Sequence, residues 1–246
     1  MIVKTDKDRE GMRAASRIVK KALDAAESFI RPGVTTLDID AVVEKTIRDA
    51  GGIPSSKGFQ GYPNASCVSV NDVVVHGIPS LQMVKSGDIV SVDITVLLNG
   101  YQGDAARTFA VGDVAEADLK LIKAAEAAFF AGMEYAKAGN RLGDISSAIQ
   151  LYSEINGYGV VRALSGHGIG HKMHEPPEVP NFGNKHTGPV LKNGLCIAVE
   201  PMITRGGWRV HYASDGWTAK TDDGSNAAHY ENTIIVTDNG PEILTL

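Results

Sequence analysis

Apolar residues recur at the three- and four-residue spacing of an amphipathic helix in four segments of the chain. We expect helices over residues 8–30, 36–51, 116–138 and 144–156. Arg31-Pro32-Gly33 ends the first helix, and Thr36 or Asp38 caps the second. The apolar face of the first helix consists of Met12, Ala15, Val19, Ala22, Ala26 and Phe29. The pattern therefore predicts two pairs of helices, one pair in each half of the chain.

Strand-like apolar runs follow each pair of helices, and one of these runs ends in a hairpin signal. Asn99-Gly100 favours a two-residue type I′ turn, which requires positive φ at both positions. With that turn Thr95 faces Asp104, and Asp93 and Asp104 become diagonal neighbours with backbones about 7–8 Å apart. A slip of one residue would move one acid to the opposite face, so this prediction depends on the turn type.

The chain also contains an internal repeat. Lys85-Ser86-Gly87 precedes the run that contains Asp93, and Lys192-Asn193-Gly194 precedes the run that contains Glu200, at an offset of 107 residues. At an offset of 106 residues, Gly33, Asp38, Ile39 and Val43 correspond to Gly139, Asp144, Ile145 and Ile149. Two helices followed by strands, twice, predict an α+β fold with two pseudo-twofold-related halves. We expect one compact domain over residues 1–246, with halves at about 1–112 and 113–246 and the site between them.

Composition excludes several classes of protein. The chain has 246 residues, 43% hydrophobic and 22% charged, and its net charge of −5 indicates no broad nucleic-acid footprint. Cys67 and Cys196 lie in separate apolar runs, which implies neither a disulfide framework nor a cysteine zinc site. No apolar run reaches 18 residues, and the charged N-terminus lacks a signal-peptide core. We expect a soluble, cytoplasmic monomer without a membrane or nucleic-acid partner.

Four acids occupy matched positions in the repeat. Asp93 and Glu200 each interrupt an apolar run, and Asp104 and Glu231 each lie in the run that follows. Acids brought together in apolar surroundings repel one another unless cations join them. Two divalent cations would balance the four negative charges, and His167, in a glycine-rich segment expected to form a tight turn with an exposed imidazole, completes the set. Oxygen ligands with one nitrogen suit Mn, Fe(II), Co or Zn.

A different metal site competes with this one. His167, His171 and His174 are spaced by four and three residues, which on a helix would form a mononuclear zinc site. The glycines between them and Pro176-Pro177 disfavour such a helix.

Several motifs in order resemble those of type I methionine aminopeptidases. They are Val75-His76-Gly77-Ile78-Pro79, Asp93 with Asp104, Gly166-His167-Gly168-Ile169-Gly170, His174-Glu175, Glu200-Pro201 and Tyr230-Glu231-Asn232-Thr233. The resemblance covers the chain from the first helix to the last strand. It implies the pita-bread fold, with two pseudo-twofold-related halves around a central antiparallel sheet.

The resemblance also implies roles for individual residues. Asp93, Asp104 and Glu231 would hold one metal, and Asp104, His167, Glu200 and Glu231 the other. A hydroxide held between the two metals would attack the first peptide bond and remove the initiator methionine when the next residue is small. Glu200 would move the proton, while His76 and His174 would contact substrate and stabilise the tetrahedral intermediate. Phe59, Tyr62, Cys67 and Trp217 would line the methionine pocket. Nascent polypeptides emerging from the ribosome would be the substrates.

Two residues depart from the usual family pattern. Met173 stands where many relatives have a bulky aromatic residue, and His229 stands where many have glutamine. We expect the first to reshape the pocket or its entrance, and the second to add a titrating neighbour to Glu231. Two alternatives keep the fold, namely an Xaa-Pro-type peptidase and a binding protein that has lost catalysis. Xaa-Pro-type enzymes usually carry an additional N-terminal domain, and non-catalytic relatives lose ligands, whereas all five ligand positions are filled here.

Overall fold

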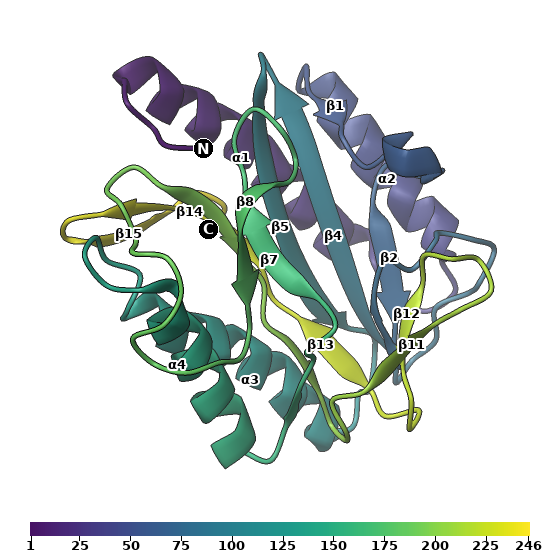
Figure 1. Cartoon of the computed structure of the whole chain (residues 1–246). Coiled ribbons are helices and arrows are strands. Elements are labelled where there is room, and N and C mark those ends of the chain that lie inside the picture. The colour runs from purple at the N-terminus through teal and green to yellow at the C-terminus, as the bar shows by residue number, and fades with distance from the viewer.

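The computed structural model describes all residues, 1–246, and contains four α-helices, a short 3₁₀ helix and fifteen strands (Figure 1). The helices are α1 (Asp6–Phe29), α2 (Thr36–Asp49), α3 (Glu116–Met133), α4 (Leu142–Ile155) and the 3₁₀ helix Phe59–Gly61. The first strands are β1 (Ile53–Pro54), β2 (Cys67–Val70), β3 (Val73–Val75), β4 (Ile89–Leu98), β5 (Tyr101–Ala110), β6 (Gly159–Val160), β7 (Ser165–Gly168) and β8 (Glu175–Pro180). The remaining strands are β9 (Cys196–Val199), β10 (Met202–Thr204), β11 (Val210–Tyr212), β12 (Ala219–Thr221), β13 (Ala227–His229), β14 (Asn232–Thr237) and β15 (Gly240–Ile243).

The longest strands, β4 and β5, form the predicted hairpin. Asn99 and Gly100 have φ of 51° and 84°, and Leu98 pairs with Tyr101. Thr95 therefore faces Asp104, and Asp93 faces Ala106, in the register that the Asn-Gly turn predicted. Strands β1 and β2 also pair with β4, and every pairing between named strands in the molecule is antiparallel.

A five-stranded sheet in the order β15-β14-β9-β7-β8 carries the acids of the second half. Strand β9 ends at Val199, because Glu200 is followed by Pro201, which has no N–H to continue the ladder. Glu231 precedes β14, whose first residue, Asn232, pairs with Val199. Glu200 and Glu231 thus flank the same end of two paired strands. The sequence pattern had instead placed each of them within a strand-like run.

The segment around His167 is strand β7 rather than the tight turn that its glycines predicted. A Cβ atom on Gly166 would lie 2.3 Å from the carbonyl oxygen of Ala198, and one on Gly168 would lie 2.2 Å from that of Pro176. These glycines therefore let β7 fit closely between its neighbouring strands. The His167 side chain is 14% exposed, so the prediction of an exposed imidazole was wrong as well.

The helix boundaries differ from the predicted ones at their ends. Thr35, and not Thr36 or Asp38, is the N-cap of α2, and its side chain accepts a hydrogen bond from the N–H of Asp38. Helix α3 ends at Met133, before the predicted residue 138, and α4 begins two residues before Asp144.

The repeat is visible in the backbone that precedes α2 and α4. Gly33 and Gly139 have φ of 94° and 93°. Asp38 accepts a hydrogen bond from the N–H of Thr35, and Asp144 accepts one from the N–H of Arg141. In each case an aspartate in the first helical turn satisfies a backbone donor that the helix leaves free. The division into halves near residue 112 stays a prediction.

Strands β5 and β14, from the two large sheets, meet at the centre of the molecule. The N–H of Glu231 donates to the carbonyl of Ala106 at 3.0 Å, and Arg107 donates to the carbonyl of Glu231. One buried apolar cluster lies beside α1 and α2 and another beside α3 and α4. These two clusters support the strands that carry or flank the acids.

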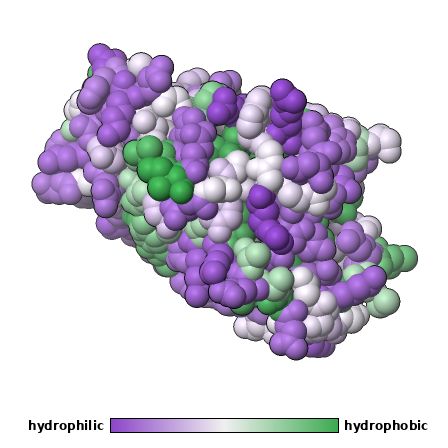
Figure 2. All heavy atoms as spheres, turned by 90° about the horizontal axis from the view of Figure 1, so that it is seen from below, coloured by the Kyte–Doolittle hydropathy of each residue, from purple (hydrophilic) through white to green (hydrophobic).

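No helix in the structure combines the length and the apolar character needed to span a membrane. Figure 2 shows one face of the molecule, where hydrophobic groups are scattered over a mainly hydrophilic surface.

Candidate metal centre

Four acidic side chains from distant parts of the sequence line one cavity of about 380 Å³. Asp93 and Asp104 project from β4 and β5, and Glu200 and Glu231 flank the ends of β9 and β14. Asp104 is 4% exposed and Glu231 is 2% exposed. The four acids that the repeat singled out therefore meet in one buried place.

Two threonine hydroxyls hold Asp104. Thr95, its partner on β4, donates from Oγ1 to Oδ1 of Asp104 at 2.9 Å. On β14, Thr233 Oγ1 accepts from the N–H of Asp104 and donates to its carbonyl oxygen, both at 2.9 Å. Oδ2, the other carboxylate oxygen, lies 3.7 Å from Nε2 of His167.

His167 faces two of these acids with one ring nitrogen. Its Nδ1 lies 2.9 Å from the carbonyl oxygen of Gly168. A carbonyl only accepts hydrogen bonds, so Nδ1 carries the proton and Nε2 presents a lone pair in the neutral ring. Nε2 is 3.7 Å from Asp104 Oδ2 and 3.7 Å from Glu200 Oε1. Burial lowers the pKa of His167 to about 4, so the ring is neutral at pH 7.

The protonation of the acids reflects their burial and their mutual repulsion. Burial raises the pKa of Asp93 to about 7. Burial, and then the charge of Asp93, raise the pKa of Asp104 well above its ordinary value. Burial and the neighbouring acids do the same to the pKa values of Glu200 and Glu231. The four carboxylates cannot all be ionised here without cations to balance them.

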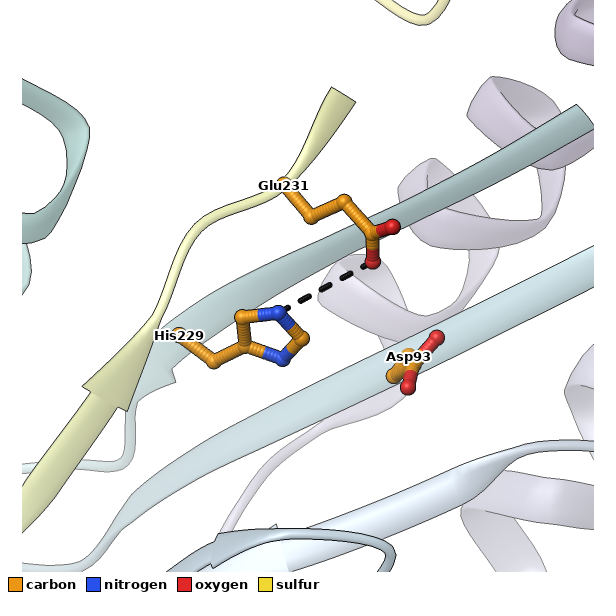
Figure 3. Close-up of side chains that lie close together, drawn as sticks. All are labelled: Asp93, His229 and Glu231. Carbon is orange, nitrogen blue, oxygen red and sulfur yellow. Dashed lines mark ion pairs between the residues drawn. The ribbon is translucent and has the colours of Figure 1, made fainter. Parts of the chain in front are cut away.

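The donor set fits divalent cations. One lone-pair nitrogen and several carboxylate oxygens point at a common space, an arrangement that repels itself until positive charge enters it. The candidate ligand atoms form two groups, and within each group all the atoms lie within 4.8 Å of one another. The first group is Asp104, His167 and Glu231, and the second is Asp93, His229 and Glu231. Figure 3 shows the second group, with the side chains of His229 and Glu231 directed toward Asp93.

The same cavity also has an aromatic and apolar wall. Phe59, Tyr62, Cys67, His76, His174 and Trp217, to which the resemblance gave substrate contacts, all line the cavity. The rings of Phe59 and His174 lie 5.2 Å apart, and those of Tyr62 and Trp217 lie 5.1 Å apart. Edge-to-face contacts of this kind fix the orientation of the rings. The cavity therefore joins an acidic floor to an apolar wall.

Comparison with known proteins identifies the fold and the family. The model of metallopeptidase family M24 matches residues 10–238. The chain belongs to this family. It is 53% identical to a methionine aminopeptidase from Clostridium acetobutylicum, over 100% of this chain and 99% of that protein.

Solved structures agree with this assignment. The crystal structure of methionine aminopeptidase from Thermotoga maritima superposes with a TM-score of 0.97 at 43% identity, covering 100% of this chain and 99% of that one. An Xaa-Pro dipeptidase from Bacillus anthracis superposes with a TM-score of 0.81 at 27% identity, but this chain covers only 62% of it. These neighbours confirm the predicted pita-bread fold, and they make the Xaa-Pro alternative the weaker one.

The structure does not contain the helical site of three histidines that the mononuclear zinc alternative requires. His167 lies on strand β7, and no helix carries it together with His171 and His174. His171 is exposed, and its Nδ1 lies 2.8 Å from the carbonyl oxygen of Gly100. The three imidazoles therefore do not share a helical face.

The thiol of Cys67 is poorly suited to act as a nucleophile. Burial, with the nearby charge of Asp93, raises the pKa of its thiol well above the ordinary value. Because the thiolate is the nucleophilic form, the buried thiol is a poor nucleophile. The structure gives Cys67 a place in the apolar wall only.

Sequence reasoning missed some contributors to the site. Thr95 could have been recognised, because the predicted register placed it opposite Asp104. Thr233 carried no such signal, because its contact with Asp104 joins strands from different sheets. His229 lies beside Glu231, as expected, and burial lowers the pKa of its imidazole to about 3, while its effect on the pH profile stays a prediction.

Proposed function

We propose that the protein removes the N-terminal methionine from polypeptides whose second residue is small, by hydrolysis of the first peptide bond. The observation that carries this proposal is a single cavity lined both by buried carboxylates with an imidazole and by aromatic and apolar side chains. Relatives that match over almost their full length at 39–53% identity are named methionine aminopeptidases, which supports the same substrate.

Asp93, Asp104, His167, Glu200 and Glu231 are the proposed metal-binding residues, with Asp104 and Glu231 shared between two divalent ions. Their oxygen and nitrogen donors suit Co, Mn, Fe(II) or Zn. When bound, such ions lower the pKa of water to give a nucleophile at neutral pH and polarise a carbonyl oxygen.

Glu200 is the proposed proton carrier. Its side chain is 13% exposed and reaches the cavity from the end of β9. Burial, with the charges of Asp93 and Asp104, raises the pKa of its carboxyl group. Once cations stabilise its ionised form, this carboxylate could accept a proton from the attacking water and deliver it to the leaving amine nitrogen.

His174 and His76 are the proposed substrate contacts. Burial lowers the pKa values of both imidazoles, that of His76 to about 4, so each ring is neutral and can donate one N–H. The His174 ring lies 4.4 Å from the His167 ring, beside the acidic floor, where an N–H could stabilise the oxyanion of the tetrahedral intermediate. The His76 ring lies against Trp217 on the apolar wall.

The methionine side chain would occupy the wall formed by Phe59, Tyr62, Cys67 and Trp217. A flexible thioether packs well against aromatic rings and against the small thiol of Cys67. Tyr62 is fixed because its hydroxyl donates to the carbonyl of Gly77 at 3.0 Å, so its ring is a rigid part of the pocket. Met173 also lines the cavity, where it supplies a flexible side chain.

The deciding experiment compares two peptide classes with metal-stripped protein that is resupplied with single metals. We expect release of methionine from Met-Gly-Met with Co, Mn, Fe(II) or Zn, and slow cleavage of Xaa-Pro peptides. Preferential cleavage before proline would instead support the Xaa-Pro alternative. Turnover without any divalent ion would contradict the proposed metal centre.

Removal of either shared carboxylate tests the ligand assignment. Asp104→Asn and Glu231→Gln should each lower kcat/KM by at least about a thousandfold, because neither amide can replace a bridging carboxylate. Asp113→Asn, an exposed substitution away from the cavity, is the matched control. Near-normal turnover in either site variant would remove its shared role.

Because such substrates are new polypeptides, we expect the enzyme to act in the cytoplasm, where polypeptides emerge from the ribosome. A monomer suffices for this activity, because all the proposed site residues belong to one chain.

A further inference from the structure

His229 lies beside Glu200 and Glu231 and has no role in the mechanism described above. It is the last residue of β13 and is 1% exposed. Its backbone is fixed by Thr108, whose hydroxyl accepts from the N–H of His229 and donates to its carbonyl oxygen, both at 2.9 Å. The strand therefore holds this imidazole in one place.

Neither ring nitrogen of His229 has a hydrogen-bond partner. Nε2 lies 3.8 Å from Glu231 Oε2 and 3.9 Å from Glu200 Oε2, beyond hydrogen-bond distance (Figure 3). A buried polar group without a partner is costly, and native structures contain few of them. An imidazole nitrogen held near two carboxylates at these distances leaves room for a cation that both could bind.

The spacing around His229 matches that around His167. Nε2 of His167 lies 3.7 Å from each of its two carboxylate oxygens, and Nε2 of His229 lies 3.8 and 3.9 Å from its two. Two ligands that each lie about 2.1 Å from one ion can be separated by up to about 4.2 Å. Asp93, His229 and Glu231 also form one of the two groups whose ligand atoms lie within 4.8 Å of one another.

We propose that His229 is a nitrogen ligand of the divalent ion held by Asp93 and Glu231. Each of the two ion positions then contains one imidazole together with shared carboxylates. The inference rests on the proposed metal centre, and it changes the chemistry of the second position. A nitrogen ligand there favours Co, Ni or Zn over ions that prefer oxygen alone, such as Mg or Mn.

The test measures metal binding rather than activity. Metal-free wild-type protein and His229→Gln are titrated with Co²⁺ by calorimetry, and the loaded proteins are examined by X-ray absorption at the cobalt edge. We expect two equivalents in both proteins, with one equivalent bound at least about tenfold more weakly by His229→Gln. The number of imidazoles per two ions should fall from two to one.

The control is His211→Gln. His211 is an exposed histidine beside a carboxylate, 2.9 Å from Asp222 Oδ1, and it does not line the cavity. Its replacement should leave both affinities within about twofold. In Asp93→Asn, which weakens the same position, the further change His229→Gln should have a smaller effect than in wild type, because the two residues serve one ion.

If His229→Gln folds poorly, the wild-type protein alone can still test whether His229 binds an ion. A cobalt-loaded crystal structure should show Nε2 of His229 at about 2.0–2.1 Å from an ion. A single imidazole per two ions, or an unchanged count in His229→Gln, would overturn this inference and leave the dinuclear centre standing. Failure of wild type to bind divalent ions would overturn the proposed function as well.

Discussion

At the scale of single residues, the site depends on side chains that position the acids as much as on the acids themselves. Asp104 is held by hydroxyls of Thr95 and Thr233, from two different sheets. Thr233 satisfies both backbone groups of Asp104 at a buried point where β5 and β14 meet. The geometry of the centre is therefore coupled to the contact between the sheets.

Thr233→Val tests this coupling. The substitution conserves volume but leaves the N–H and carbonyl of Asp104 buried without partners, which costs about 1–3 kcal/mol. We expect the free energy of unfolding in urea to fall by this amount. Thr187→Val, at an exposed hydroxyl that donates to the carbonyl of Asn184, should change it by less than about 0.5 kcal/mol. Equal effects of the two changes would contradict the role given to Thr233.

The four acids could be grouped from sequence because they occupy matched positions of the internal repeat, Asp93 and Asp104 within strands and Glu200 and Glu231 at strand ends. His229 could not be assigned in the same way. Its role depends on a distance of 3.8 Å to Glu231 and on the lack of any hydrogen-bond partner, and neither is encoded in local pattern. The surrounding sheets also decide that its ring is neutral, by removing it from water.

At the scale of elements, turn chemistry was the most reliable guide. Asn99-Gly100 determined the β4–β5 register, because few residues tolerate positive φ at both positions of a turn. The prediction failed at strand β7, because local sequence does not show how closely the neighbouring strands approach. Gly166 and Gly168 suggest a turn locally, but they are needed for close approach of β8 and β9, which only the assembled sheet reveals.

The repeat leads to a paired prediction at this scale. Gly33 and Gly139 precede the caps of α2 and α4 with φ of 94° and 93°, and a Cβ atom at either position would meet nothing within 4 Å. The cost of alanine is then purely conformational, roughly 1–2 kcal/mol. Gly33→Ala and Gly139→Ala should lower the free energy of unfolding by equal amounts within about 0.5 kcal/mol. A clear difference would show that the two turns are not equivalent.

At the scale of the whole molecule, two apolar clusters support strands that bring acids together against their mutual repulsion. Burial raises the pKa values of Asp93, Asp104, Glu200 and Glu231, whereas burial lowers those of His76, His167, His174 and His229. The metal-free fold therefore contains two sets of groups with opposite effects on stability. Below about pH 6.5 the two sets oppose each other, because the unfolded chain binds protons at the histidines and the folded chain retains them at the acids.

Above pH 7 only the acids remain in this balance. The histidines are largely neutral in both states, and the unfolded chain has released its acidic protons. The folded, metal-free chain holds its buried carboxyl protons to higher pH, that of Asp93 to about pH 7. The stability that these acids contribute is greatest where both states are protonated and is lost as the pH rises through the folded pKa values. We expect urea denaturation of the metal-free protein to show this decline as the pH rises above 7.

Divalent ions should abolish that decline, because bound cations stabilise the ionised carboxylates and displace their protons. The same denaturation series with saturating Co²⁺ should therefore be flat or rising as the pH rises above 7. Asp104→Asn, which removes one acid and relieves its neighbours, should flatten the metal-free curve. A metal-free wild-type protein whose stability rises over this range would show that the four carboxylates are ionised without cations, and the charge balance inferred for the centre would be wrong.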